Sequence, residues 1–182
     1  ARVACEKLDP KYWYGQWCDP QGSQALIALI HARPHEYRER ILAQLDRGCR
    51  SDTSLIDYLR VWQLALLRCG PFDDATLATI RARIGLSYPS GLPDADSELV
   101  RVLAYLDEPR VIEPALAALA SDATQEEKIH YAHCLLAVKS GWTVDTRRRC
   151  LELIDALRAS ATGGASLTKF VDEIRTRFVD GL

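Results

Sequence analysis

Between residues 55 and 69, apolar side chains recur at alternating intervals of four and three residues: Leu55, Leu59, Trp62, Leu66 and Cys69. This spacing follows one face of an α-helix, whose period is about 3.6 residues. The Gly70-Pro71 pair directly after the stripe is typical of a helix end. The sequence therefore predicts a helix that begins near Ser51 or Thr53 and buries this stripe in a hydrophobic core.

The same kind of pattern, bounded by glycine, proline or a capping side chain, recurs along most of the chain. No segment alternates apolar and polar residues over the length of a strand. The expected fold class is therefore all-α, with about nine helices whose sequential neighbours are antiparallel. The other predicted helices run from Ser23 to before Pro34, from Pro34 to Gly48, from Asp73 to Gly85, from Asp94 or Asp96 to Leu106, from Ile112 to Leu119, from Thr124 to Gly141, from Thr143 and from Ser166.

The spacing of these helices also bears on the architecture. Helix pairs recur at roughly 35–40 residues, close to the repeat length of HEAT proteins. This favours a HEAT-like α-solenoid over the alternative, an irregular helical bundle. Residues 1–22 are rich in aromatic residues, proline and glycine without a sustained period. We expect them to form an irregular N-terminal segment whose aromatic side chains cap a single α-helical repeat domain over residues 23–182.

Composition narrows the classes of partner. The 23 basic and 25 acidic side chains give a net charge of -2, which lacks the basic excess typical of nucleic-acid binding proteins. No apolar run is long enough to span a membrane, and the first residues lack the apolar core of a signal peptide. Because the chain starts at Ala1 and contains no methionine, we expect an excised domain or a processed product.

The six cysteines form neither Cys-x-x-Cys nor Cys-x-x-Cys-His. These spacings would be needed for common zinc sites and for covalent c-type haem attachment, so we expect neither within this chain. Cys69, Cys134 and Cys150 lie in apolar helical patterns, where a buried free thiol is the common outcome. Cys5 and Cys18 are the best candidates for a disulfide.

The helix predicted from Thr124 carries the strongest metal-like pattern, because Glu127-x-x-His130 has the spacing of diiron carboxylate ligands and His133 follows. One such motif does not complete a site. The favoured interpretation is structural: Glu127 closes a capping box with Thr124, and His130 bonds a backbone carbonyl or a carboxylate. Glu127, His130 and His133 remain the metal-ligand candidates, and no residue is assigned a catalytic role.

Other chemically suggestive residues are given structural interpretations. Cys134 adjoins His133, but consecutive helical side chains point about 100° apart and cannot share a proton. His31 and His35 flank a predicted helix break, where solvated histidines are favoured over a surface metal site. Arg147–Arg149 should fan outward into solvent. Trp142, at a predicted helix junction, should seal the gap between two helices.

Six short segments occur in a fixed order along the chain: Leu64–Gly70, Tyr88–Gly91, Glu98–Pro109, Thr124–Tyr131, Val138–Thr143 and Gly163–Ser166. This ordered set, within residues 55 to 180, resembles the helical-repeat region of large bacterial PVC-type haem-containing proteins, also named membrane-bound dehydrogenases. In that family a β-propeller precedes the helical region and a c-type cytochrome domain follows it. The resemblance implies that haem belongs to a separate domain, with no cofactor in this chain, and that the parent protein is exported to the periplasm or cell surface.

Our leading functional hypothesis is a non-catalytic helical scaffold or docking domain, which positions neighbouring domains or protein partners. Exposed aromatics and irregular loops are where recognition concentrates. The partner-binding candidates are therefore Trp13, Trp17, Tyr88, Pro89 and Leu92.

The alternative hypothesis is a metal- or haem-binding redox subunit. In it, Glu127, His130 and His133 bind the cofactor, with His31 or His35 or a partner chain completing the site. A HEAT-like base-excision enzyme is disfavoured by the neutral charge.

Overall fold

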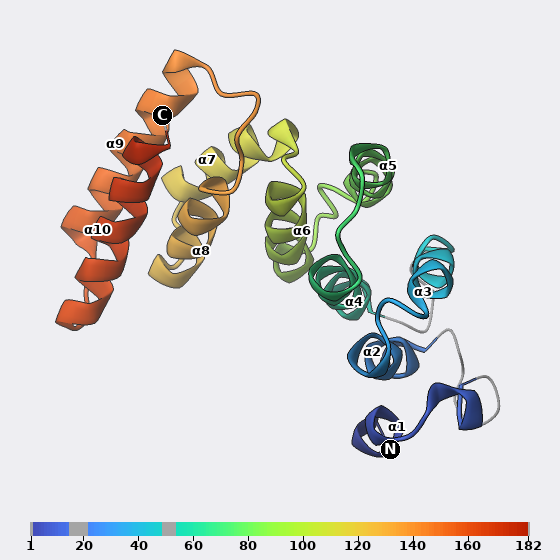
Figure 1. Cartoon of the computed structure of the whole chain (residues 1–182). Coiled ribbons are helices and arrows are strands. Elements are labelled where there is room, and N and C mark those ends of the chain that lie inside the picture. Colours follow the sequence, from blue (N-terminus) through green and yellow to red (C-terminus); the bar gives the residue numbers. More distant parts are fainter. Residues whose placement is uncertain (1, 15–21, 49–53, 182) are drawn as a thin grey trace. The chain divides into compact units, whose positions relative to one another are not determined.

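The computed structural model describes residues 2–14, 22–48 and 54–181. These residues form ten α-helices and two short 3-10 helices, and they contain no strand (Figure 1). The all-α fold class is therefore confirmed. Among the described helices, none combines the length and apolarity needed to cross a membrane.

The chain divides into two compact units, residues 1–83 and 84–182. The N-terminal segment is more regular than expected, since it contains helix α1 (Arg2–Lys7) and a 3-10 helix (Pro10–Tyr12). The nine predicted helices correspond to α2–α10, and α1 accounts for the tenth.

In addition to α1, the first unit contains α2 (Ser23–Ala32), α3 (Arg38–Leu45), α4 (Leu55–Arg68) and most of α5 (Asp74–Gly85). Helix α2 lies at its centre and packs against α1, α3 and α4, while α3 also packs against α4. The predicted stripe on α4 lies in the core: Leu59, Trp62, Leu66 and Cys69 are buried.

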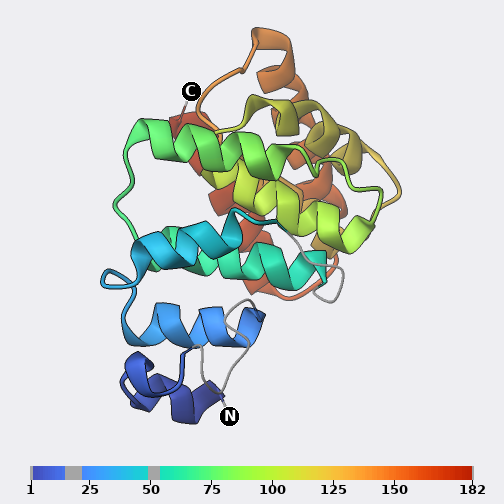
Figure 2. The ribbon, with the colours of Figure 1, turned by 90° about the vertical axis from the view of Figure 1, so that its right-hand side faces the viewer.

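The second unit contains α6 (Pro93–Tyr105), α7 (Ile112–Ala120), α8 (Gln125–Leu135), α9 (Val144–Ser160) and α10 (Ala165–Asp180). Helix α8 packs against each of the other four, α7 also packs against α9, and α9 against α10 (Figures 1 and 2). Fully buried side chains from all five helices fill the space between them: Leu99, Leu103, Leu116, Leu135, Ile154 and Ile174.

Several helix ends follow the predicted chemistry. The Thr124 hydroxyl accepts from the Glu127 amide, and the Glu127 carboxylate accepts from the Thr124 amide at 2.8 Å, which completes the capping box of α8. Asp73 accepts from the Thr76 amide at the start of α5. These bonds satisfy amides that a helix start leaves without intrahelical partners.

Helix α4, predicted to begin near Ser51 or Thr53, is capped by Ser54. Two other predicted starts are wrong. Helix α10 begins after Gly164 without a side-chain cap, so Ser166 lies inside the helix. Neither Asp94 nor Asp96 caps α6, because Pro93 occupies its first turn and the Asp96 carboxylate accepts from amides in the preceding loop instead.

Two loops at one end of the second unit are locked together. The Asp107 carboxylate accepts from the backbone amides of Lys139 (2.7 Å) and Ser140 (2.9 Å). Asp107 has a positive φ of 55°, and Gly141, at φ 77°, lies directly against the Pro109 ring. We call this set, Asp107, Pro109 and Lys139–Gly141, the corner interlock.

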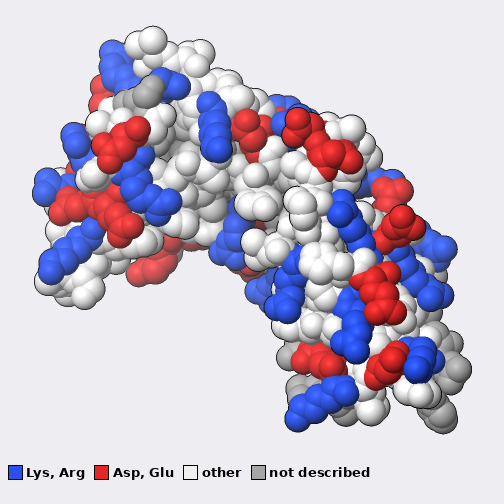
Figure 3. Space-filling model, viewed as in Figure 1, with Lys and Arg blue, Asp and Glu red and all other residues white. Residues whose placement is uncertain are grey.

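Charged side chains of both signs intermingle on the face of each unit seen in Figure 3. In the second unit, several bridge neighbouring helices: Arg149 to Glu113, Arg175 to Asp155 and Arg158 to Asp172. Because these pairs are solvent-exposed, each contributes only about 0.2–1 kcal/mol to stability.

Substitution of Gly141 by alanine tests the close contact between Gly141 and Pro109 in the corner interlock. A Cβ at Gly141 would overlap Pro109, whereas a Cβ at Gly91, whose φ of 76° is nearly the same, meets nothing within 4 Å. Gly91→Ala should cost about 1 kcal/mol of unfolding free energy, from the left-handed backbone alone. Gly141→Ala should cost about 2–4 kcal/mol, because overpacking adds to that strain.

The measurement is urea unfolding of both variants, followed by circular dichroism. Equal losses of stability in the two variants would contradict a close contact between Gly141 and Pro109.

Candidate functional site

The loop Leu86–Leu92, between α5 and α6, contains three of the partner-binding candidates. Tyr88 is half-buried, and burial raises its pKa to about 12, with Tyr131 and Asp96 nearby. The Asp96 carboxylate accepts from the Ser90 amide at 2.6 Å and from the Gly91 amide at 3.3 Å. The loop backbone is therefore tied to α6, and Tyr88 is partly withdrawn from solvent.

Apolar side chains on this loop remain in water. Leu92 is 60% exposed, Leu86 is 85% exposed, and Pro89 is also exposed. A leucine in solvent loses the free energy that burial would provide, so two on one short, hydrogen-bonded loop are a notable surface feature. Leu86 was not among the sequence candidates, because its place after Gly85 indicates only the end of a helix.

The N-terminal candidates differ from this loop. Trp13 is only 3% exposed, its indole donates to the Leu8 carbonyl at 3.3 Å, and its ring meets Tyr14 edge-on. This placement agrees with an aromatic cap and leaves little of the Trp13 ring for a partner. Trp17, together with Cys18, lies outside the described residues.

The metal-ligand candidates on α8 have separate neighbours. The Glu127 carboxylate is engaged in the capping box, His130 contacts the Ser97 carbonyl of α6, and the exposed His133 stacks on Phe170 of α10. Within the described part of the chain, no group of three or more His, Cys, Asp or Glu side chains has a metal-binding arrangement. The structure therefore does not bring Glu127, His130 and His133 together. His31 and His35 are both exposed in the first unit.

His130 links α8 to α6 as a neutral imidazole. Its Nε2 lies 2.9 Å from the Ser97 carbonyl oxygen, so Nε2 carries the proton, and Nδ1 is left to accept from Arg101 at 3.4 Å. Burial lowers the pKa of His130 below its ordinary value of 6.5, the Ser97 bond opposes this shift, and Arg101 adds to it.

Cys134 lies one helical turn from His130, with its sulfur 3.6 Å from Nε2. From the sequence, Cys134 was considered only beside its neighbour His133. The pair with His130 was missed, although a spacing of four residues places two side chains on one helical face. Burial raises the pKa of Cys134 to about 11, which keeps the thiol protonated at neutral pH. Cys69 and Cys150 are also buried, as predicted.

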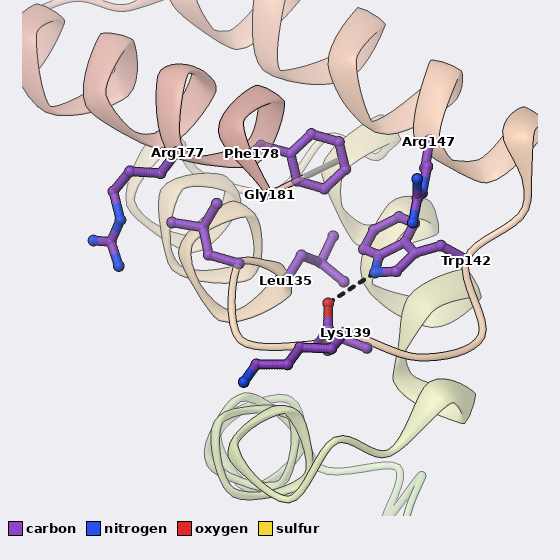
Figure 4. Close-up of a pocket in the computed structure, with 9 residues that line it drawn as sticks. Leu135, Lys139, Trp142, Arg147, Arg177, Phe178 and Gly181 are labelled. Carbon is purple, nitrogen blue, oxygen red and sulfur yellow. Dashed lines mark hydrogen bonds between the residues drawn. The ribbon is translucent and has the colours of Figure 1, made fainter.

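A pocket of about 350 Å³ lies at the C-terminal end of α8, among α8, α9 and α10. Its walls combine apolar and aromatic side chains, including Leu135, Trp142 and Phe178, with the basic residues Lys139, Arg147 and Arg177 (Figure 4). We call it the α8–α10 pocket. The pocket is not evident from the sequence, because its lining residues are separated by up to 46 positions, from Leu135 to Gly181.

The three consecutive arginines have different neighbours and do not form one patch. Arg148 pairs with Asp145 on its own helix, and Arg149 pairs with Glu113 of α7. Of these three arginines, Arg147 is the one that lines the α8–α10 pocket. Trp142 seals the α9 junction as predicted: its indole donates to the Val138 carbonyl at 2.9 Å, and its ring meets Phe178 edge-on.

Comparison with known proteins gives no relative for this chain. No protein-family model, no curated protein and no solved structure matches it.

The His130 link predicts how stability changes with pH. Because the pKa of His130 is lower in the folded state than in the unfolded state, the unfolded chain binds more protons between the two values. The stabilisation is fully present above pH 6.5 and is lost as the pH falls through the folded-state pKa. His130→Gln should flatten the loss of unfolding free energy between pH 7.5 and pH 5.5, about the range in which histidine titrates.

Chemical unfolding at several pH values measures this effect. His35→Gln, at an exposed position of the first unit, is the control, and it should keep the pH dependence of the wild type. If His130→Gln also keeps it, the lowered pKa of His130 does not contribute to stability.

Proposed function

We propose that this chain is a non-catalytic helical docking domain, which binds a protein partner through the loop Leu86–Leu92. The observation that carries the proposal is the exposure of Leu86 and Leu92 on a loop that the Asp96 carboxylate and the half-buried Tyr88 hold in place. A loop fixed before binding loses little conformational entropy when a partner covers it.

The exposed leucine side chains gain free energy when a partner covers them. Full burial of one leucine stabilises a complex by about 1.5–3 kcal/mol. Leu92 also stands at the N-cap of α6 without a side-chain hydrogen bond to the helix. Since Ser, Thr, Asp or Asn would stabilise that position better, a leucine there serves the helix poorly and suits a role at the surface.

The helix packing supports a scaffold of the solenoid type. Within the second unit, α6 contacts α8, α7 contacts α9 and α8 contacts α10, in addition to the sequential contacts of α7 with α8, α8 with α9 and α9 with α10. In the first unit, α2 likewise contacts both α3 and α4. Packing onto the next helix and the one after it is typical of HEAT-like repeats, whose surfaces bind other proteins.

The resemblance to PVC-type haem-containing proteins extends the proposal to the partners. The docking domain would then position a β-propeller and a c-type cytochrome within an exported bacterial redox protein, and the haem would belong to the cytochrome. The support for this extension is the order, along residues 64–166, of the six segments that resemble that family.

Leu92→Asp tests the docking loop directly. Aspartate is favoured at an N-cap, so the variant should keep the helicity of the wild type. Loss of one buried leucine contact should weaken partner capture about tenfold or more. The measurement is quantitative affinity capture from an extract of the source cells with the wild type and the variant as bait.

Leu67→Asp on α4 is the matched control, because Leu67 is 71% exposed and undergoes the same chemical change. It should capture the same partner as the wild type. A partner that binds the wild type and Leu92→Asp equally would overturn the assignment to the Leu86–Leu92 loop.

A further inference from the structure

We infer that the α8–α10 pocket binds a small organic anion, in which a carboxylate is joined to an apolar or aromatic body. The inference goes beyond the docking function, because no residue of the Leu86–Leu92 loop lines this pocket. It rests on the charge of the rim, on the apolar side chains of the lining, and on the bonds that fix the Lys139 backbone and the Trp142 ring before a ligand arrives.

The rim carries positive charge from three different parts of the second unit. Lys139 comes from the α8–α9 loop, Arg147 from the first turn of α9, and Arg177 from the last turn of α10. The described lining residues include no carboxylate side chain. Arg177 lies 3.8 Å from Glu173 on its own helix, but both side chains are more than half exposed, so this pair is weak.

Helix capping accounts for only part of this charge. A positive side chain near the C-terminus of a helix is favourable, which explains Arg177 on α10. Arg147 lies in the first turn of another helix, α9, where the positive end of the α9 dipole disfavours a positive charge. Like charges around one concave surface also repel each other, and an anion bound among them would relieve that repulsion.

Apolar side chains line much of the pocket. Phe178 is almost fully buried, Leu135 is fully buried, and Trp142 lies beside both with its ring half-buried (Figure 4). The volume of about 350 Å³ falls within the range of small-molecule sites. Inorganic phosphate or sulfate would meet the charges and leave the aromatic surface in water. A carboxylate with an apolar body satisfies both parts of the pocket.

The pocket walls are fixed by contacts outside the pocket. The corner interlock bonds the Lys139 amide to Asp107, and the Trp142 indole is tied to the Val138 carbonyl. The Lys139 backbone and the Trp142 ring therefore stand in position without a ligand, which reduces the ordering cost of binding.

The test uses N-acetyl-L-phenylalanine as the probe, with its uncharged amide, N-acetyl-L-phenylalaninamide, as the matched ligand. Binding is followed on the complete chain by the NMR signal of the Trp142 indole N–H, which a Trp142→Phe variant identifies. The acid should shift this signal in a saturable way at millimolar concentrations, and the amide should bind about tenfold more weakly. Inorganic phosphate should not compete at equal concentration.

Charge-neutralising variants locate the site. The double substitution Lys139→Gln and Arg177→Gln should weaken binding of the acid about tenfold or more, with helicity unchanged. Lys169→Gln, an exposed position on α10 outside the pocket, is the matched control and should leave binding unchanged. No saturable shift, equal binding of acid and amide, competition by phosphate, or an equal effect of Lys169→Gln would each overturn the inference. None of these outcomes bears on capture through the Leu86–Leu92 loop.

Discussion

A single carboxylate, that of Asp107, holds together the two loops that end α6 and α8. It accepts from two successive amides, at Lys139 and Ser140, in a part of the chain where α8 has ended and supplies no helical acceptor. The positive φ of Asp107 aims its side chain at that loop, and the close fit of Gly141 against Pro109 fixes the distance between the loops. Apolar burial brings α6 and α8 together, while this polar contact sets the path of the chain beyond them.

Further links in the second unit have the same character. His130 ties α8 to the Ser97 carbonyl, and the Gln125 side chain exchanges two hydrogen bonds with the backbone of Thr162 in the α9–α10 loop. In each case a side chain on one element satisfies backbone groups on another. The α8–α10 pocket depends on this framework, because Lys139 belongs to the corner interlock and Trp142 follows it directly.

The sequence predicted what is encoded locally. Helices α2–α10 were identified because burial of one face imposes the spacing seen in Leu59, Trp62 and Leu66, and the Thr124 capping box was found because its partners are three residues apart. What depends on distant partners was missed. Asp96 was predicted to cap α6, because nothing in the neighbouring sequence shows that its carboxylate accepts a hydrogen bond from the preceding loop. The α8–α10 pocket was missed because its lining residues come from three helices and the loop between two of them. Trp13 illustrates the same limit, since composition alone does not distinguish a buried aromatic cap from an exposed anchor.

The most direct test of the corner interlock separates its hydrogen bonds from its backbone conformation. Asp107→Gly permits the positive φ but removes the acceptor, whereas Asp107→Asn retains both an acceptor and tolerance of that conformation. The measurement is amide hydrogen exchange at Lys139 and Ser140 together with the unfolding free energy. We expect Asp107→Gly to accelerate exchange at both amides and to lose about 2 kcal/mol, with Asp107→Asn close to the wild type. Unchanged exchange in Asp107→Gly would contradict the account, because the two loops would then be held together without the Asp107 carboxylate.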